Sequence, residues 1–302
     1  MLVRSSRALV SALALATLAA AGAACTITTA PASPDGGTAT TTPGQDGGTT
    51  PAPTNTTPTT PVGPNVVGAA GIAGWDALAD KDVVKSFGTL YLHQSVGQDL
   101  EDGADAVGYK FEYYGPDNQA GQPTAMGLNG GIFTDVAGIA NGAPMEKMAA
   151  VRKALATHKS RLKVLFFSFG YADVRDEDLG AVEAEYAKLV AEVKAAGVRF
   201  VHVTPPLVYS VAENPPKMKM RSWMIDTFKD DTIFDLQDIE SMDGGQRCEE
   251  GGTWRICQAN RSTVACPSKG QGIDEDGAGH ICASKAQSYA KALLFAIQRA
   301  GR

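Results

Sequence analysis

The chain has 302 residues, of which 44% are hydrophobic and 20% are charged, and its formal net charge is −6 at pH 7. This composition suits a globular protein. A mildly acidic chain without a block of Lys and Arg argues against a nucleic-acid partner or an anionic membrane surface. After residue 24 no apolar run reaches the length of about 18 residues that a membrane-spanning helix needs.

Residues 1–24 have the pattern of a secretory signal peptide. Arg4 and Arg7 form a positively charged start, residues 8–21 are apolar, and residues 22–24 (Gly-Ala-Ala) form a small-residue cleavage site. The sequence therefore predicts an exported protein.

Cys25 follows that site directly, where a bacterial lipoprotein carries the cysteine that is acylated. The segment resembles a lipoprotein signal, although Gly22 stands where such signals usually have Leu. Five cysteines leave one unpaired, and Cys25 lies far from the other four. We expect a membrane anchor through lipidated Cys25, and Thr26, in place of a retaining Asp, favours the outer membrane or cell surface. The alternative is ordinary cleavage, which would give a soluble periplasmic or secreted protein.

Residues 25–65 are rich in Thr, Pro and Gly and contain almost no apolar side chains. Such a segment cannot bury enough surface to offset the entropy of ordering it. We expect a disordered linker that gives the anchored protein reach.

Residues 66–302 change periodicity and alternate between short apolar runs and amphipathic helices. Strand–helix alternation predicts a parallel sheet covered by helices on both faces, and therefore one three-layer α/β/α domain. The expected strands are 88–92, 163–169, 198–203 and 232–236, and the expected helices are 96–107, 143–160, 176–196, 218–228 and 283–300.

Sites in such sheets form at the carboxyl ends of the strands. The first of these strands leads into His93-Gln94-Ser95-Val96-Gly97. A Ser at a strand-to-helix turn can expose its hydroxyl while the amides of the first helical turn point to the same space, ready for an oxyanion. The alternative is that Ser95 and Gln98 form a helix capping box without any chemistry.

The later strand ends carry further polar blocks, among them Gly170-Tyr171-Ala172-Asp173 and the segment 274–280 before the last helix. In order and spacing these blocks resemble the SGNH-type hydrolases, relatives of the Gly-Asp-Ser-Leu esterases, and particularly a branch with a His-x-Ser-Val-Gly first block. The resemblance covers roughly Phe87 to Arg302. It implies a flavodoxin-like SGNH-hydrolase-type domain and the hydrolysis of esters without a cofactor.

Carried over block by block, the resemblance makes Ser95 the nucleophile and gives its amide to the oxyanion hole. Asn141-Gly142-Ala143-Pro144 is similar to the second block, which makes Gly142 the second oxyanion donor. Ala172 stands where the third block has an Asn that donates to the oxyanion. His93 is a candidate to replace that donor.

The last block of the family is Asp-x-x-His, which implies His280 as the base. Asp276 is the expected orienting carboxylate, but it lies four residues before His280 and not three, so Asp274 and Asp173 stay open as alternatives. The other histidines are weaker candidates. His158 is expected at the surface near a helix end, His202 is expected inside a strand, and His93 remains an alternative base because it lies so close to Ser95.

Four cysteines lie in a Gly-rich, polar stretch that resembles an insertion at about 243–273 and the start of the last helix. They contain no Cys-x-x-Cys pair, so we expect no zinc or other metal site. In an exported chain two disulfides are expected, and of three connectivities we favour Cys248 with Cys257 and Cys266 with Cys282.

Three functions remain open from the sequence. The first is a surface-anchored serine esterase acting on acyl or acetyl esters, with an extracellular polysaccharide as a candidate substrate. The second is a catalytically impaired surface module that keeps the fold to bind glycans or other partners, which the missing Asn favours. The third is a purely structural lipoprotein.

Overall fold

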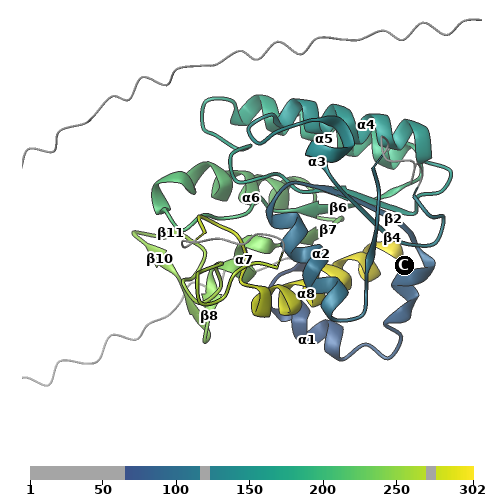
Figure 1. The fold of residues 1–302 in the computed structure, drawn as a ribbon. Helices are drawn as coiled ribbons and strands as arrows, with labels where there is room; N and C mark the ends of the chain where they lie inside the picture. Colours follow the sequence, from purple (N-terminus) through teal and green to yellow (C-terminus); the bar gives the residue numbers. More distant parts are fainter. Residues whose placement is uncertain (1–64, 116–122, 270–276) are drawn as a thin grey trace, which may run out of the picture. The chain divides into compact units, whose positions relative to one another are not determined.

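The computed structural model describes residues 65–115, 123–269 and 277–302. Within these residues, seven parallel strands form one sheet in the order β1-β7-β6-β5-β2-β4-β3 (Figure 1). The strands are β1 (Val66–Val67), β2 (Gly88–His93), β3 (Phe111–Tyr113), β4 (Gly127–Ile132), β5 (Val164–Phe167), β6 (Arg199–Val203) and β7 (Thr232–Phe234).

Helices cover both faces of this sheet. Helices α1, α2 and α8 pack against one another on one face, and α4 and α5 pack on the other, with α3 against α4 and α6 against α5 (Figure 1). The predicted three-layer α/β/α fold is therefore confirmed. The helices are α1 (Ala70–Asp76), α2 (Val96–Ala106), α3 (Phe133–Ala137), α4 (Pro144–His158), α5 (Leu179–Ala195), α6 (Pro215–Thr227), α7 (Leu236–Glu240) and α8 (Ala283–Gly301), with 3-10 turns at η1 (Asp82–Ser86) and η2 (Val211–Glu213).

The core has two parts because side chains alternate along each strand. In β2, Leu90 and Leu92 point into the cluster under α4 and α5, whereas Tyr91 points into the cluster under α2 and α8. Tyr91 stacks on Phe166 of β5 with 4.4 Å between ring centroids. Both faces of β2 are thus buried, which explains why its sequence has no polar alternation.

Strand β2 lies where the order of the sheet reverses. It pairs with β4 on one side and β5 on the other, and without the edge strands β1 and β3 the order is that of flavodoxin-like doubly wound sheets. Ligand sites of such folds lie at the carboxyl end of this reversal point. The loop after β2, which contains Ser95, occupies that place.

Strand β4 was not expected from the sequence, because Gly-Leu-Asn-Gly-Gly-Ile lacks the side chains typical of a strand. The structure shows the reason for the glycine at 130. A Cβ there would overlap Glu101 Oε1, so Gly130 leaves room for that carboxylate of α2.

The placement of His158 at the surface was wrong: it is 4% exposed and contacts the Tyr114 hydroxyl at 3.1 Å, and burial lowers its pKa.

After α7 the chain forms two short hairpins, β8 (Met242–Asp243) with β9 (Gln246–Arg247) and β10 (Glu249–Glu250) with β11 (Thr253–Trp254). Figure 1 shows β8, β10 and β11 on the same side of the sheet as α7 and the first turns of α8. Both predicted disulfides are present, Cys248–Cys257 and Cys266–Cys282. Across residues 65–115, 123–269 and 277–302, no helix is long and apolar enough to cross a bilayer.

Candidate active site

Ser95 lies at the sharp turn between β2 and α2. Its backbone has φ +49° and ψ −97°, and it is the one non-glycine residue with positive φ in the described part of the chain. Such a conformation costs about 1–3 kcal/mol and persists only where the surroundings enforce it. The turn around Ser95 is tightly packed, since a Cβ on Gly97 would overlap His93 Cβ.

The interpretation of Ser95 as part of a capping box is wrong. Ser95 occupies the N-cap position of α2, but its side chain makes no capping hydrogen bond, and the Gln98 side chain donates to Asp102 instead. The Ser95 hydroxyl therefore does not cap α2, although its position in the sequence suggested that role.

The Ser95 hydroxyl contacts His280, which is 185 residues away in the sequence. Ser95 Oγ lies 2.8 Å from His280 Nε2, and His280 Nδ1 lies 2.8 Å from Asp99 Oδ2. With Nδ1 protonated, His280 donates to Asp99 and its Nε2 accepts the serine proton. A hydroxyl, an imidazole and a carboxylate in this series can generate a serine nucleophile.

Asp99 is the residue that the sequence reasoning missed. It lies one helical turn after Ser95, so both side chains project from the same face of α2. Asp99 is 3% exposed, and the same carboxylate oxygen that contacts His280 also accepts from the Ile281 amide at 2.9 Å. The i, i+4 spacing was a usable signal once Ser95 was proposed, and the first turn of a helix also stabilises a carboxylate through the helix dipole.

The segment around His280 is held by the insertion. The Ser262 amide donates to the His280 carbonyl at 2.6 Å, and the Cys282 amide donates to the Asn260 carbonyl at 2.9 Å. The Cys266–Cys282 disulfide then ties the first residue before α8 to the same segment. These contacts position the imidazole from both sides.

Asp276, Asp274 and Cys25 lie outside the described residues. Asp173, the other candidate partner of His280, has different partners: it accepts from the Gly142 amide at 2.7 Å, from the Gly170 amide at 2.6 Å and from Lys147 Nζ at 2.5 Å. Asp173 and Lys147 are both fully buried, and burial lowers the pKa of Lys147. This pair joins the loop after β5 to helix α4.

The same contact corrects the role expected of Gly142. Its amide, which the resemblance assigned to an oxyanion hole, donates to the Asp173 carboxylate. Gly142 has φ +85°, a conformation that turns this amide toward Asp173 without strain. The Gly97 and Gln98 amides donate to the Gln94 and Ser95 carbonyls, so the amides of Ser95 and Val96 are the candidate oxyanion donors nearest to the serine in sequence.

His93 is fully buried below the first turn of α2, with Nε2 2.9 Å from Glu101 Oε1. The angles at this contact are poor for a hydrogen bond. A fully buried ring does not reach a bound substrate, so the structure supports neither the oxyanion nor the base role for His93. His202 is also fully buried and contacts the Tyr186 hydroxyl at 3.1 Å, as expected for a histidine inside a strand.

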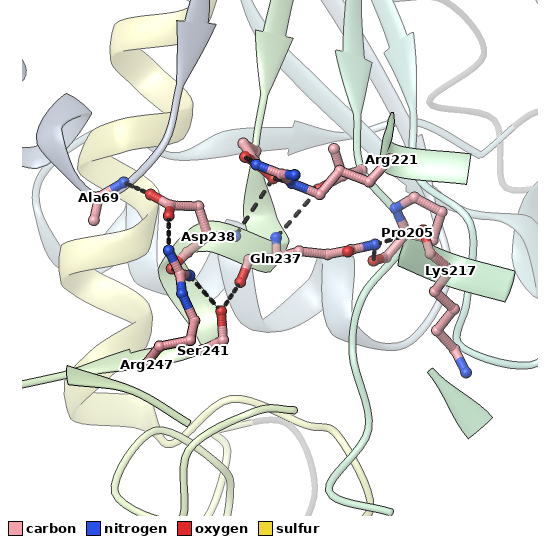
Figure 2. Close-up of polar contacts among 10 residues, drawn as sticks. Ala69, Pro205, Lys217, Arg221, Gln237, Asp238, Ser241 and Arg247 are labelled. Atoms are coloured by element: carbon pink, nitrogen blue, oxygen red, sulfur yellow. Dashed lines mark hydrogen bonds and ion pairs between the residues drawn. The ribbon is translucent and has the colours of Figure 1, made fainter. Parts of the chain in front are cut away.

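Buried polar contacts fix the loop after β6 next to this site. Figure 2 shows the Gln237 amide of α7 directed at the carbonyls of Pro205 and Lys217, at 2.8 and 2.9 Å. Asp238 accepts from the Ala69 amide and from Arg247 (Figure 2). Helix α7 thus connects the strand ends to the insertion.

Glu240 continues this network toward His280. One of its carboxylate oxygens accepts from the Leu207 amide at 2.7 Å, and the Leu207 carbonyl lies against Gly279, where a Cβ would come within 2.7 Å of it. Burial raises the pKa of Glu240 well above its ordinary value. The loop carrying His280 therefore rests on a carboxyl group that burial favours in its neutral form.

No group of three or more His, Cys, Asp or Glu side chains with the geometry of a metal site occurs among the described residues. No family model and no curated protein matches this chain. Among solved structures, the chain is similar to one described as "a putative platelet activating factor from Streptococcus pneumonia", with 12% identity, a TM-score of 0.38, and coverage of 74% of this chain and 88% of that one.

Proposed function

We propose that this protein is a serine ester hydrolase in which Ser95 is the nucleophile, His280 the general base and Asp99 the carboxylate that orients His280. The observation that supports the proposal is the unbroken series of two 2.8 Å contacts from the serine hydroxyl to the Asp99 carboxylate. A helix cap requires no imidazole beside it.

In the reaction, Ser95 Oγ attacks the ester carbonyl while its proton passes to His280 Nε2. The resulting imidazolium is stabilised by Asp99, and the oxyanion meets the amides of Ser95 and Val96 at the start of α2, where the helix dipole favours negative charge. His280 then gives the proton to the leaving alcohol, which leaves an acyl-serine. Water, deprotonated by His280, hydrolyses that acyl-serine and restores the hydroxyl.

Hydrolysis of 4-nitrophenyl acetate tests the proposal. Ser95→Ala is expected to lower kcat by about 10⁴-fold or more, because the covalent intermediate can no longer form. A fluorophosphonate should label the wild-type chain on Ser95 and leave Ser95→Ala unlabelled. Turnover that is equal in both proteins would exclude the mechanism.

A catalytically impaired glycan-binding module is the second candidate. It is favoured by Ala172 in place of the oxyanion Asn and by the engagement of the Gly142 amide with Asp173. Loss of one oxyanion donor costs about 2.7–4 kcal/mol of transition-state stabilisation. No fluorophosphonate labelling of Ser95, together with binding of a glycan, would favour this candidate.

The substrates proposed here are acyl or acetyl esters, including those of extracellular polysaccharides. We also propose that the protein is an exported lipoprotein, anchored through Cys25 to the outer membrane or cell surface. The two disulfides support export, because such bonds persist in oxidising compartments. Mass spectrometry of the exported protein is expected to show acyl chains on Cys25, and a mature chain with unmodified Cys25 would contradict the anchor.

A further inference from the structure

The side chain of Gln94, the residue directly before Ser95, is buried but makes no hydrogen bond within the described residues. It is 8% exposed, and its Oε1 atom is fully buried without a partner. Its Nε2 atom also has no partner there and is the polar atom of this side chain that reaches the surface. Because the large majority of buried polar groups are hydrogen-bonded, this unused amide beside a candidate nucleophile requires an explanation.

The backbone on both sides of Gln94 is fixed. The Leu92 carbonyl accepts from the Ser168 amide at 3.0 Å, and the Gln94 carbonyl accepts from the Gly97 amide at 3.0 Å. Adjacent Cα atoms are about 3.8 Å apart, so Gln94 and Ser95 project their side chains from neighbouring points of one rigid turn. A donor that is already held in place loses little conformational entropy when a substrate binds.

Gln94 lies one residue past the end of β2. Side chains alternate along a strand, so position 94 continues the row of Leu90 and Leu92, which point into the cluster under α4 and α5. The loops that contain Gly142 and Ala172 lead into these two helices. Gln94 is therefore on the same side of the sheet as the two positions at which further oxyanion donors were expected.

Neither of those two positions supplies such a donor. The Gly142 amide is engaged by the Asp173 carboxylate, and Ala172 has only a methyl group. Gln94, next to Ser95, has two amide N–H groups. An oxyanion hole needs donors that are held in place and have no competing partner. The Gln94 amide meets both conditions.

We propose that Gln94 is a catalytic residue whose Nε2 donates a hydrogen bond to the oxyanion formed when Ser95 attacks an ester, in place of the donor missing at Ala172. This inference rests on the proposed esterase function and adds a residue to that site. As the bond from Ser95 Oγ to the carbonyl carbon forms, an electron pair of the carbonyl moves to its oxygen and the serine proton passes to His280. Gln94 gives up no proton, and its hydrogen bond weakens when the carbonyl re-forms and the alcohol leaves.

The first test is Gln94→Met, which keeps the approximate size of the side chain and removes the amide. With 4-nitrophenyl acetate it is expected to lower kcat by about 10²- to 10³-fold and to leave KM nearly unchanged. Gln98→Met is the matched control, because the Gln98 amide lies one helical turn further along and donates to Asp102. This control should retain nearly full kcat. Gln94→Glu, also of similar size, places a negative charge beside the oxyanion and should lose at least as much.

The second test separates a catalytic role from a structural one. Trifluoromethyl phenyl ketone accepts a serine oxygen at its carbonyl and gives a tetrahedral adduct with a negatively charged oxygen, whereas methyl phenyl ketone binds without a stable adduct. By calorimetry, Gln94→Met is expected to weaken binding of the trifluoro ketone roughly tenfold or more and to leave binding of the methyl ketone unchanged. Equal loss of both affinities would show that Gln94 only supports the turn, and would overturn the proposal.

The outcomes distinguish this proposal from the esterase proposal. Hydrolysis that is lost in Ser95→Ala but unchanged in Gln94→Met and Gln94→Glu would refute the role of Gln94 and leave the esterase intact. Tighter binding of the trifluoro ketone that depends on Gln94, without any hydrolysis, would refute the esterase alone. Wild-type protein that neither hydrolyses the ester nor prefers the trifluoro ketone would refute both.

Discussion

The two halves of the candidate triad are built in different ways. Ser95 and Asp99 come from one turn of α2, a regular helix anchored by the core. His280 comes from an irregular segment that is held by backbone contacts to residues 260–262 and by the Cys266–Cys282 disulfide. The nucleophile and the carboxylate therefore need only one helix for their relative position, whereas the base depends on the insertion.

This difference indicates what the disulfide-containing insertion does. A loop contributes little buried apolar surface, and its position has to be fixed by crosslinks and hydrogen bonds. The insertion supplies the crosslink and the hydrogen bonds that hold His280, which does not lie on α2. Changes to α2 should affect the site directly, and changes to the insertion should affect it through His280.

The largest effect is expected on the helix side. Asp99→Asn should lower kcat about 10³ to 10⁴-fold with little change in stability, because an amide cannot hold His280 in the required tautomer. The rate of 4-nitrophenyl acetate hydrolysis measures this. Asp102→Asn, on the same helix and bonded to Gln98, is the control and should retain nearly full activity. Equal activity of both variants would remove Asp99 from the triad.

On the insertion side, Cys266→Ala/Cys282→Ala should lower kcat about 10- to 100-fold and the free energy of unfolding by about 3 kcal/mol. The reason is that the base loses one of its two anchors. Cys248→Ala/Cys257→Ala removes the disulfide that does not include the His280 segment. It should lower the free energy of unfolding with a smaller change in kcat, and a larger loss of kcat in this control would contradict the comparison.

The turn before α2 is expected to tolerate no added side chain. Gly97→Ala should lower the free energy of unfolding by about 1–3 kcal/mol, because its Cβ would press on His93. Gly180 occupies the equivalent second position of α5, and, apart from its chain neighbours and the backbone of its own helix, no atom lies within 4 Å of the place that a Cβ would take there. Gly180→Ala should therefore be neutral or stabilising in urea unfolding, and a similar loss in both variants would show that the turn is not crowded.

The smallest effect concerns Glu240. A carboxyl group whose folded pKa is raised binds more protons in the folded state, so the stability it contributes is present at low pH and is lost as pH rises from about 4.5 toward the raised value. Glu240→Gln should remove this loss, so its Tm should rise relative to wild type between pH 5 and 8. Parallel Tm profiles over that range would show that Glu240 does not titrate as its burial indicates.

The fold was predictable because its main strands are continuous apolar runs and its helices have clear amphipathic spacing. Strands β2 and β5 and helices α2, α4, α5 and α8 lie within a few residues of the predicted ranges. Strands β3 and β4 escaped prediction since β3 is short and β4 is Gly-rich. Strand β4 is placed by pairing with β2 and by the fit of Gly130 against Glu101, and β3 is placed by pairing with β4, which is tertiary information.

The site was predictable in part. The meeting of Ser95 with His280 followed from the convergence of strand ends at one sheet edge. The carboxylate did not follow, because the Asp-x-x-His block points to the residues before His280, whereas Asp99 lies on the helix that follows the serine. The engagement of Gly142 by Asp173 depends on the buried Lys147, whose sequence position on a helix gives no sign of burial.

The distance in sequence between Ser95 and Asp99 on one side and His280 on the other also sets the order in which the candidate site is assembled during synthesis. A chain is synthesised from its amino terminus onward, so Ser95 and Asp99 are present well before residue 280 arrives. Until the segment with His280 docks, Ser95 has no base. Under the proposed mechanism, an emerging chain is therefore inert toward esters; hydrolysis starts when residue 280 docks beside Ser95 and becomes faster when the Cys266–Cys282 disulfide closes.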